Sequence, residues 1–409
     1  MVRIVKNLFH LINAFFASIF YSFPAKKLTV IGVTGTDGKT TNTHLIYEIL
    51  KQAGLKAAMI STVEARIDGK SYDTGFHVTT PSPWQLQKLI KKVVDSQAEY
   101  IVLETTSHAL DQSRIFGCSV DIGVVTNISH EHLDYHKTLE SYKEAKAKIL
   151  NGVKFSVLNK DEANFEYLQR KASGKVVTFS LEGKADYSLS DFHFKPKIPG
   201  RFNLYNCLAA ATISSIIGIS KKNIEKAITS FKGIPGRTEE IETKRNFRVI
   251  VDFAHKPNAL KEVLAWVRKI TRNKLIVVFG CAGERDRFKR PMMGEIAGKM
   301  ADYIILTAED PRSEDVRDII DEIAEGCKKT KVQVGEKKNT ISFLKSNRKY
   351  FFQIPDRQEA INFAIRKLAK SGDVILLCGK GHEQSMCYGR TEYPWDEKQA
   401  VNKALYGKV

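Results

Sequence analysis

Short runs of apolar and β-branched residues recur along the chain, and each ends at a cluster of small or polar residues. Apolar residues at helical spacing lie between many of these runs; residues 40–53, for example, place Leu45 and Ile49 on one face. Strands that alternate with helices predict an α/β fold with open, mainly parallel sheets. The runs that we predict as strands are residues 28–33, 100–103, 122–125, 249–251, 275–279, 303–306 and 374–377.

The polar clusters that follow the strands contain most of the residues with useful chemistry. They read, in chain order, GTDGKT, ETTSH, TNISHEH, DFAHKP, GCAGERD, TAEDPR and CGKGH. In parallel sheets, ligands bind beyond the carboxyl ends of the strands. We therefore expect these loops to assemble one site.

The pattern changes near residues 233–238 (GIPGRT), after a helix-rich segment at residues 203–231. A chain of 409 residues is also too long for one ordinary core. The glycine-rich GTDGKT loop in the first part predicts a P-loop-type ATPase domain with a mainly parallel sheet, and the strands of the second part predict a Rossmann-like C-terminal α/β domain. The predicted parts are an apolar N-terminal helix at residues 1–23, a central ATP-binding domain at 24–235 and a C-terminal domain at 236–409.

The balance of charge narrows the class of partner. The chain has 64 Lys and Arg against 46 Asp and Glu, which gives a formal net charge of +18. Such a balance suits polyanions: nucleic acid, an anionic membrane or a phosphorylated small molecule. Because no basic block alternates with aromatic residues, we do not expect a nucleic-acid partner. Six scattered cysteines without metal-type spacing favour reduced thiols and a cytoplasmic location.

The first 23 residues are rich in Phe, Ile and Leu, and polar residues recur among them at helical spacing. No small-residue cleavage site follows, so we do not expect a signal peptide. The polar interruptions argue against a helix that spans a membrane. Two alternatives remain: a helix that covers an apolar surface of the protein itself, or an interfacial helix that contacts a membrane.

The stretch from Val30 to Leu50 runs a strand into a glycine-rich turn and then into a helix. Backbone N–H groups of Gly35, Thr36, Asp37 and Gly38 can surround phosphate oxygens. Lys39 can then reach the outer phosphates, and the Thr40 hydroxyl can bind Mg²⁺. The spacing is shorter than the full P-loop pattern, because Val33 stands where that pattern has glycine. We predict a nucleotide site here.

Glu104 follows a predicted strand, in a position suited to a carboxylate that binds metal. A second acidic and His-rich cluster comprises His130, Glu131, His132, Asp134 and His136. By itself, such a cluster is more typical of a hydrogen-bonded loop than of a metal site.

Nine motifs occur in an order that resembles the Mur ligases. They are GTDGKTT, ETTSHALDQSR, TNISHEHLDYH, GRFNLYNCLAA, GIPGRTE, DFAHKPNAL, GCAGERDRFKRPMMGEIA, EDPRSED and CGKGHEQ. The resemblance covers residues 23–400 and is closest to the members that add a diamino acid to UDP-N-acetylmuramoyl-dipeptide in peptidoglycan synthesis. It implies ATP-driven amide formation. A substrate carboxylate takes the γ-phosphoryl group, and the incoming amine then attacks the acyl phosphate.

The resemblance also implies roles for individual residues around ATP and two Mg²⁺ ions. The implied ATP-binding residues are Gly35, Thr36, Asp37, Gly38, Lys39, Thr40, Thr41, Asn203, Asn206, Arg237, Asp252 and His255. The implied metal ligands are Thr40, Glu104, His132 and Lys146, and the implied catalytic residues are Lys39, Glu104, His132 and Lys146. Lys146 matches a lysine that the family carbamylates. Without the resemblance, its place in SYKEAKAK predicts a surface helix lysine.

Two further groups of residues match the binding sites for the muramoyl-peptide and for the amino acid. The first group is Thr79, Thr80, Ser82, Thr106, His108, Gln112 and Arg114. The second group is Arg290, Glu309, Asp310, Arg312, Gly379 and Glu383.

Arg312 favours meso-diaminopimelate as the amino acid added, because a guanidinium can grip the distal carboxylate with two hydrogen bonds. The alternative for Arg312 is a surface salt bridge with Glu314 or Asp315. The usual Asp-Asn before the proline is Glu309-Asp310 here. A carboxylate in place of an amide adds negative charge, which keeps lysine or another diamino acid open as a second candidate.

The sequence differs from the family in a second way, at its N-terminal end. Family members carry an N-terminal domain of about a hundred residues that grips UDP, a common domain size. The apolar segment at residues 1–23 stands in its place. Three alternatives follow: a basic surface holds the nucleotide-sugar, a partner protein supplies the contact, or the substrate is lipid-linked and the first helix lies at the inner face of the membrane. A non-catalytic ATP-binding partner protein is the remaining alternative to a ligase.

Overall fold

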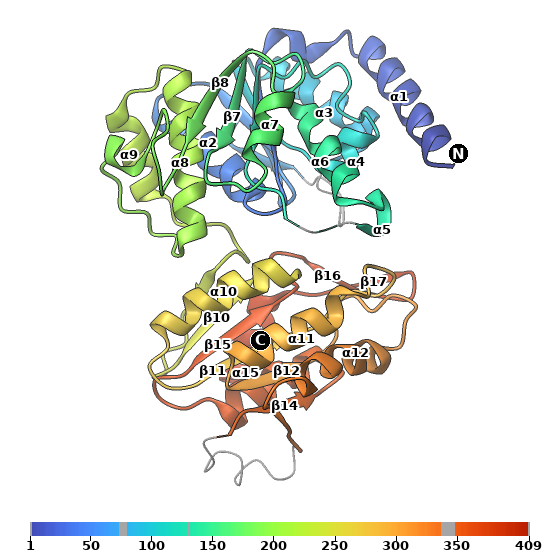
Figure 1. Cartoon of the computed structure of the whole chain (residues 1–409), viewed down its shortest axis with the longest axis vertical. Coiled ribbons are helices and arrows are strands. Elements are labelled where there is room, and N and C mark those ends of the chain that lie inside the picture. The colour runs from blue at the N-terminus through green and yellow to red at the C-terminus, as the bar shows by residue number, and fades with distance from the viewer. Residues whose placement is uncertain (1, 73–79, 130, 132, 337–347, 408–409) are drawn as a thin grey trace. The chain divides into compact units, whose positions relative to one another are not determined.

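The computed structural model describes residues 2–72, 80–129, 131, 133–336 and 348–407. The chain divides into two compact units, Met1–Lys232 and Gly233–Val409 (Figure 1). The division falls close to the boundary that the change of pattern predicts.

Unit 1 is built on an eight-stranded sheet in the order β4-β3-β2-β5-β1-β6-β7-β8. The strands are β1 (Thr29–Thr34), β2 (Ala57–Ile60), β3 (Ala65–Ile67), β4 (Lys70–Tyr72), β5 (Tyr100–Glu104), β6 (Ile122–Val125), β7 (Phe155–Asn159) and β8 (Lys175–Phe179). β1 lies at the centre and pairs in parallel with β5 and β6. The ends of these three strands therefore meet at one edge, where the phosphate loop and the ETTSH and TNISHEH loops begin.

Helices surround this sheet. They are α1 (Val2–Phe20), α2 (Lys39–Gln52), α3 (Pro83–Asp95), α4 (Ser107–Asp111), α5 (Leu133–His136), α6 (Leu139–Ala147), α7 (Phe165–Lys171), α8 (Arg201–Ile216) and α9 (Lys221–Ser230), with a 3₁₀ turn η1 (Pro24–Lys27). The apolar stripe predicted for residues 40–53 is the buried face of α2, where Leu45 and Ile49 are fully buried. Gly54, at φ +78°, follows the end of that helix.

Unit 2 contains a seven-stranded sheet in the order β13-β14-β12-β11-β15-β10-β9, parallel except for β9. Its strands are β9 (Glu239–Ile241), β10 (Arg248–Asp252), β11 (Leu275–Phe279), β12 (Tyr303–Leu306), β13 (Gln333–Val334), β14 (Tyr350–Gln353) and β15 (Val374–Cys378). A separate hairpin joins β16 (Ser385–Tyr388) to β17 (Thr391–Pro394).

Both faces of this sheet are covered. Leu275, Val277 and Phe279 of β11 face a core shared with α10 (Pro257–Ile270), α11 (Lys289–Met300) and α12 (Val316–Lys328). Ile276 and Val278 face a second core shared with α14 (Arg357–Phe363), a π-helical turn η5 (Ala364–Leu368) and α15 (Glu397–Tyr406). This burial on both faces explains why the strand reads as an unbroken apolar run. The predicted α/β class is confirmed.

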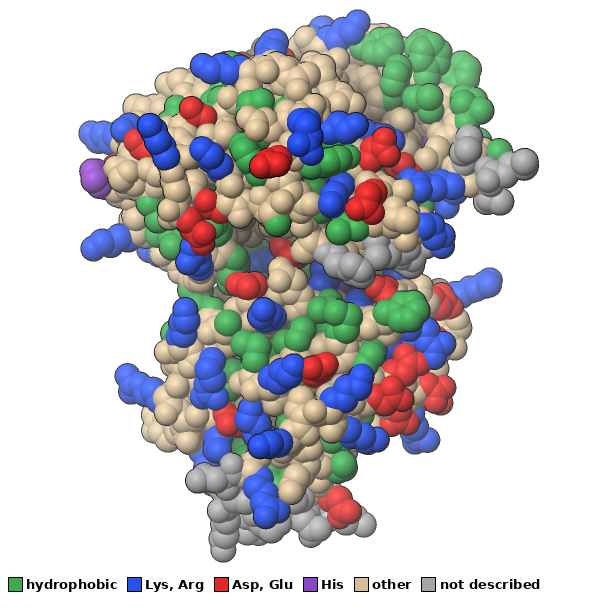
Figure 2. All heavy atoms as spheres, in the orientation of Figure 1, with side chains coloured by type: hydrophobic (Ala, Val, Ile, Leu, Met, Phe, Trp, Pro, Cys, Tyr) green, Lys and Arg blue, Asp and Glu red, His purple; other side chains and the backbone are tan. Residues whose placement is uncertain are grey.

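The N-terminal segment forms one amphipathic helix, α1, with several large apolar side chains exposed. Figure 2 shows hydrophobic side chains gathered over this helix. Of the helices in the described part of the chain, none combines the length and the hydropathy needed to cross a bilayer.

Candidate functional site

The phosphate loop, residues 35–38, connects β1 to α2. Gly35 (φ +155°) and Gly38 (φ +80°) have backbone conformations that L side chains rarely adopt. A Cβ at Gly35 would lie 1.8 Å from Thr126 Oγ1, and a Cβ at Gly38 would lie 2.3 Å from Asn206 Oδ1. Both glycines are therefore required, because the Thr126 and Asn206 side chains pack closely against them.

The loop is held in shape by the two residues that follow β6. The backbone N–H groups of Thr36 and Asp37 donate to the main-chain oxygen and to Oδ1 of Asn127, both at 2.9 Å. Thr126 Oγ1 donates to the Asp37 carbonyl at 2.7 Å. No role was predicted for this TN pair, which opens the TNISHEH motif. The feature that could have indicated a role is the position of the pair directly after β6, the strand beside β1.

Lys39 and Thr40 open α2 beneath the loop. Lys39 Nζ donates to the carbonyls of Gly35 and Thr36, both at 2.9 Å. Thr40 Oγ1 donates to Glu104 Oε1 at 3.0 Å. Thr62, which the sequence analysis missed, donates its N–H and its hydroxyl to the same carboxylate at 2.9 and 2.8 Å. Glu104 is thus buried and aimed at the start of α2.

The oxygen donors at this point suit Mg²⁺, which prefers hydroxyl and carboxylate oxygens. Thr40 and Glu104 supply one of each. Within the described residues, no group of three or more His, Cys, Asp and Glu side chains is arranged around a metal position. His132, the other predicted ligand, lies outside the described residues, as does His130.

Lys146 is almost fully buried on α6, 1% exposed. The prediction of a surface lysine, made from the local sequence alone, is therefore wrong. Lys146 Nζ lies 4.6 Å from the centre of the Tyr142 ring, and the Tyr142 hydroxyl lies 3.1 Å from Thr36 Oγ1. Helix α6 thus carries a buried lysine into the surroundings of the phosphate loop.

Helix α8 brings two predicted nucleotide-binding asparagines to the same place. Asn42 on α2 donates to Asn206 Oδ1 at 2.8 Å, and Asn206 donates to Asn203 Oδ1 at 3.0 Å. Asn206 is also the side chain nearest to Gly38. Thr41 lies half-buried in the first turn of α2.

Five residues predicted to bind the muramoyl-peptide lie on α4 or next to its two ends. The Thr106 N–H donates to Thr80 Oγ1 at 3.1 Å, and Arg114 donates to the Thr80 carbonyl at 3.3 Å and to Gln112 Oε1 at 2.7 Å. The rings of His108 and Tyr135 lie 4.2 Å apart. Of the remaining predicted residues, Ser82 accepts from the Gln85 N–H as the N-cap of α3, and Thr79 lies outside the described residues.

Asp111, on α4, was quoted within a motif but given no role. It accepts hydrogen bonds from Arg3 at 3.0 Å, Asn7 at 2.9 Å and Tyr135 at 2.9 Å. Burial opposes its ionisation, but the bonds from Arg3, Asn7 and Tyr135 outweigh burial and hold the pKa of Asp111 well below its usual value. The N-terminal helix is therefore tied to the helix that carries predicted substrate residues.

In unit 2, the predicted nucleotide-binding residues Arg237, Asp252 and His255 meet around Phe253. The Arg237 guanidinium lies 4.4 Å over the Phe253 ring, and the His255 ring lies 4.4 Å from it. Asp252 accepts from the N–H of Thr238 at 2.7 Å. Burial, assisted by Lys256 and Lys289, lowers the pKa of His255 well below its usual value, so this imidazole is neutral. The sequence analysis did not single out Phe253.

The predicted amino-acid residues gather around a lysine that was also missed. Lys380 is fully buried, and its Nζ lies 2.7 Å from both Asp310 Oδ1 and Glu383 Oε2. The carboxylate at position 310 is therefore paired with an internal cation. The extra negative charge that favoured lysine as a substrate is offset within the protein.

Glu309 lies beside this pair. A Cβ at Gly379 would lie 3.1 Å from Glu309 Cγ, so the glycine makes room for that side chain. Burial raises the pKa of Glu309 to about 7, although Lys289 and Lys380 oppose the shift. Its Oε2 has no hydrogen-bond partner among the described residues.

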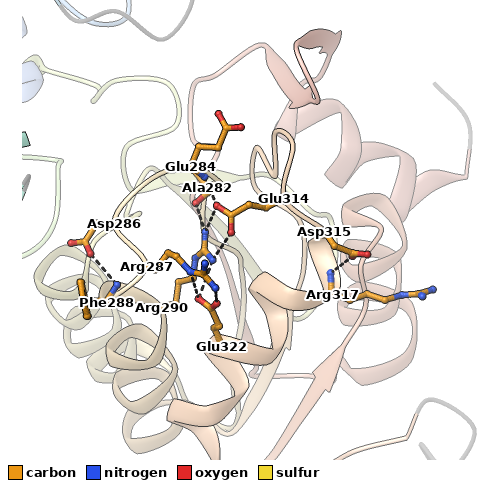
Figure 3. Close-up of polar contacts among 10 residues, drawn as sticks. All are labelled: Ala282, Glu284, Asp286, Arg287, Phe288, Arg290, Glu314, Asp315, Arg317 and Glu322. Atoms are coloured by element: carbon orange, nitrogen blue, oxygen red, sulfur yellow. Dashed lines mark hydrogen bonds and ion pairs between the residues drawn. The ribbon is translucent and has the colours of Figure 1, made fainter. Parts of the chain in front are cut away.

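The two arginines of the predicted amino-acid site differ sharply. Arg290 is fully buried and donates to Glu314 at 2.8 and 3.0 Å and to Glu322 at 3.0 Å (Figure 3). Arg312 is half-buried, with φ +54°, and its side chain makes no hydrogen bond or ion pair to the described residues. The salt bridge considered for Arg312 is not observed: Glu314 binds Arg290, and Asp315 caps α12 by accepting from the Arg317 N–H.

Comparisons with known proteins identify the family of the chain. A family model described as the Mur ligase middle domain matches residues 33–214, and one described as the Mur ligase glutamate ligase domain matches residues 236–381. A UDP-N-acetylmuramoyl-L-alanyl-D-glutamate–2,6-diaminopimelate ligase from Caldanaerobacter subterraneus is 37% identical, over 95% of this chain and 80% of its own length. A ligase of the same name from Geobacter metallireducens is also 37% identical, with the same coverage.

The solved structures that resemble the chain include a UDP-N-acetylmuramoyl-L-alanyl-D-glutamate–2,6-diaminopimelate ligase. The TM-score is 0.61 and the identity is 32%, over 93% of this chain and 78% of that one. Sequence motifs, the loop geometry of unit 1 and these matches lead to the same result: the chain belongs to the Mur ligase family.

Proposed function

We propose that this chain is an ATP-dependent ligase of peptidoglycan precursor synthesis that adds a diamino acid, with meso-diaminopimelate preferred, to UDP-N-acetylmuramoyl-L-alanyl-D-glutamate. The substrates are those in the names of the relatives. One observation carries the proposal. The glycine-lined phosphate loop, the Thr40–Glu104 pair and the cluster of Thr80, Thr106 and Arg114 all lie at the carboxyl ends of neighbouring parallel strands.

ATP supplies the driving force: its γ-phosphoryl group goes to the substrate carboxylate, and the amine then displaces phosphate as the amide forms. The residues of the chain mainly bind and orient the reacting groups. Lys39 and the loop N–H groups other than those of Thr36 and Asp37, which donate to Asn127, bind the phosphates. To do so, Lys39 exchanges its bonds to two carbonyls for bonds to phosphate oxygens.

Thr40 and Glu104 would hold Mg²⁺, which neutralises phosphate charge when it is bound. We assign Lys146 a supporting role as a carbamate, formed by addition of CO₂ to its amine. The role is supported by the burial of Lys146 beside Tyr142, whose hydroxyl contacts Thr36 of the phosphate loop, and a carbamate would convert this position to a carboxylate.

For the amino acid, we assign the distal carboxylate to Arg312. Arg312 is half-buried, and its guanidinium has no ion pair within the described residues. The Lys380–Asp310–Glu383 cluster offers carboxylate oxygens for the ammonium groups, with their charge partly balanced by the lysine.

The test is a panel of amino acids, including meso-diaminopimelate and L-lysine, offered with ATP, Mg²⁺ and the UDP-linked dipeptide. Product masses and released phosphate are measured. We expect a product with diaminopimelate and phosphate release that needs both the dipeptide and the amino acid. ATP binding without any turnover would contradict the proposal and favour a non-catalytic partner protein.

The carbamate has a separate test. Lys146→Ala should lose most of the activity, roughly 10²-fold or more, and a small carboxylic acid should restore part of it. Protein equilibrated with ¹³C-bicarbonate should show a carbamate NMR signal that is missing in Lys146→Ala. Full activity in the variant would remove this assignment without affecting the ligase itself.

A further inference from the structure

Helix α1 attaches to the rest of unit 1 through a narrow face of small residues. Ala14, Ala17 and Ser18 are fully buried. The Ser18 hydroxyl donates to the Phe116 carbonyl at 3.1 Å, and a Cβ at Gly117 would lie 2.3 Å from Ser18 Oγ. The helix is therefore held closely and in one orientation. The helix packs against the rest of unit 1, but the residues that make this contact are the small ones.

The opposite face of α1 carries the large apolar residues, and it is exposed. We call this face, with two neighbouring aromatic residues, the apolar ridge. It comprises Val5, Leu8, Phe9, Ile12, Phe15, Phe16, Ile19 and Phe20 together with Trp84 and Phe116. Phe9 is 63% exposed and Phe20 is 70% exposed. The spacing of three and four residues places them on one side of the helix.

The two aromatic neighbours make the ridge continuous. The Trp84 ring, at the start of α3, lies 5.6 Å from the Phe20 ring, and the Phe116 ring lies 6.0 Å from the Phe15 ring. Figure 2 shows the hydrophobic side chains of α1 as one connected area at the surface. Contiguous apolar surface of this kind marks an interaction site.

The charges around the ridge are almost all positive. Residues 2–30 and 81–94 contain no Asp or Glu. Exposed lysines lie on α1, on η1 and on α3, and they are Lys6, Lys26, Lys27, Lys88, Lys91 and Lys92. Two acidic residues near the ridge are paired: Asp95 with Lys91, so that lysine adds no net charge, and Asp111 with Arg3. Glu99, whose carbonyl accepts from the Thr29 N–H, is exposed.

We propose that the apolar ridge is a membrane-docking surface, with α1 lying in the interface of an anionic lipid bilayer. An exposed aromatic and aliphatic helix face bordered by lysines has the chemistry of an interfacial helix. Its apolar side chains enter the acyl boundary while lysines reach anionic headgroups. A second copy of this chain is a poorer occupant, because it would bring another lysine border against the first.

Docking would also orient unit 1. The polar end of α1 is bonded through Arg3 and Asn7 to Asp111 on α4. A bilayer that holds α1 therefore holds the helix that carries the predicted muramoyl-peptide residues. The docking surface itself does not depend on the ligase proposal.

The experiment is vesicle flotation of the full chain with two lipid compositions, phosphatidylcholine alone and phosphatidylcholine with an equal part of phosphatidylglycerol. We expect binding to the anionic vesicles that weakens as salt is raised. The double variant Phe9→Ser/Phe16→Ser should lower the partition coefficient roughly thirtyfold or more, because two aromatic side chains no longer leave water. Lys26→Glu/Lys27→Glu should lower it roughly tenfold or more.

Matched controls separate the ridge from general properties of the chain. Phe288→Ser removes an aromatic residue that is 86% exposed in unit 2. Lys222→Glu/Lys226→Glu makes the same change of net charge on α9, which lies on the opposite side of unit 1 from α1 (Figure 1). Both controls should bind anionic vesicles like the unaltered chain.

Three results would overturn the proposal: no binding to anionic vesicles, equal binding of the ridge variants and the unaltered chain, or equal loss in the controls. Light scattering without lipid tests the second copy. A dimer that Phe9→Ser/Phe16→Ser dissociates, with no vesicle binding, would assign the ridge to self-association instead. Thermal unfolding of each variant checks that the exposed substitutions leave the fold intact.

Discussion

The cationic side chains of the phosphate loop in unit 1 and of the predicted amino-acid site in unit 2 have different kinds of partner. In the loop, the cation Lys39 is held by two backbone carbonyls. In the cluster, Lys380 and Arg290 are fully buried and are bound to two carboxylates each. The loop can give up weak bonds for a phosphate, whereas the cluster would lose buried ion pairs if its cations moved.

The comparison separates residues that bind substrate from residues that hold the framework. Within unit 2, Arg290 belongs to the framework, because its guanidinium already contacts Glu314 and Glu322. Arg312, whose side chain has no ion pair among the described residues, is the arginine that we propose contacts the amino acid. Four predictions test this division.

The largest effect is expected for Lys39→Ala. Activity should fall roughly 10³-fold, because the phosphates lose a positioned cation, while the unfolding temperature should change little. Lys51→Ala, an exposed lysine in the last turn of the same helix, is the control and should keep its activity. Steady-state kinetics and a thermal melt measure both. A Lys39→Ala enzyme within about tenfold of normal activity would contradict the role of the loop.

Arg290→Met should act mainly on stability. We expect a loss of about 3 kcal/mol in the free energy of unfolding, because Glu314 and Glu322 lose their buried partner. Arg287→Met is a matched control. Arg287 pairs with the same Glu322 but is 64% exposed, so its loss should lower the stability much less than the loss of Arg290. If Arg290→Met instead raised KM for the amino acid at normal stability, Arg290 would be a substrate residue.

Arg312→Ala should act on specificity. KM for diaminopimelate should rise roughly 10-fold to 10²-fold, the value of a charged hydrogen-bonded contact, while KM for lysine should change little. Arg317→Ala, an exposed arginine on α12, should affect neither substrate. Equal effects of Arg312→Ala on both amino acids would refute the assignment of the distal carboxylate.

The last prediction concerns the effect of pH on stability through Glu309, whose pKa of about 7 in the folded chain lies above the usual 4.5. Between these two pKa values the unfolded chain releases the proton and the folded chain keeps it, so this group lowers stability as the pH rises. Glu309→Gln cannot ionise. Its stability relative to the unaltered chain should therefore rise between about pH 5 and about pH 7.5, by at most about 3 kcal/mol.

Urea unfolding at the two pH values measures this difference. Glu295→Gln is the control: Lys299 lowers the pKa of Glu295, so the effect of pH should have the opposite sign or be absent. A difference between Glu309→Gln and the unaltered chain that does not depend on pH would show that Glu309 is ionised in the folded protein.

Much of the site could be predicted from the sequence because its signals are local. One short stretch of the chain contains the strand, the two glycines, Lys39 and Thr40. In the structure it forms β1, the phosphate loop and the first turn of α2. Seven apolar runs predicted as strands are strands. Short strands with mixed patterns, such as β4 with the sequence KSY, carry too few apolar residues to be recognised.

The contacts that the sequence analysis missed join residues far apart in the chain. Arg3 and Asp111 are separated by 108 positions, and Lys380 and Asp310 by 70. The burial of Lys146 could not be predicted from its local sequence for the same reason. Its neighbours in the sequence are those of an exposed helix, but α6 turns it inward to Tyr142, where it is 1% exposed.

The sequence by itself determined the α/β class, the phosphate loop and the membership in a ligase family, because short motifs and periodicity encode them. Only the tertiary structure decided which charged residues are buried and which partner each one has. Burial and pairing depend on segments that meet through folding, so no local pattern contains them. The proposed assignment of Arg290 to the framework and of Arg312 to the amino acid rests on that packing.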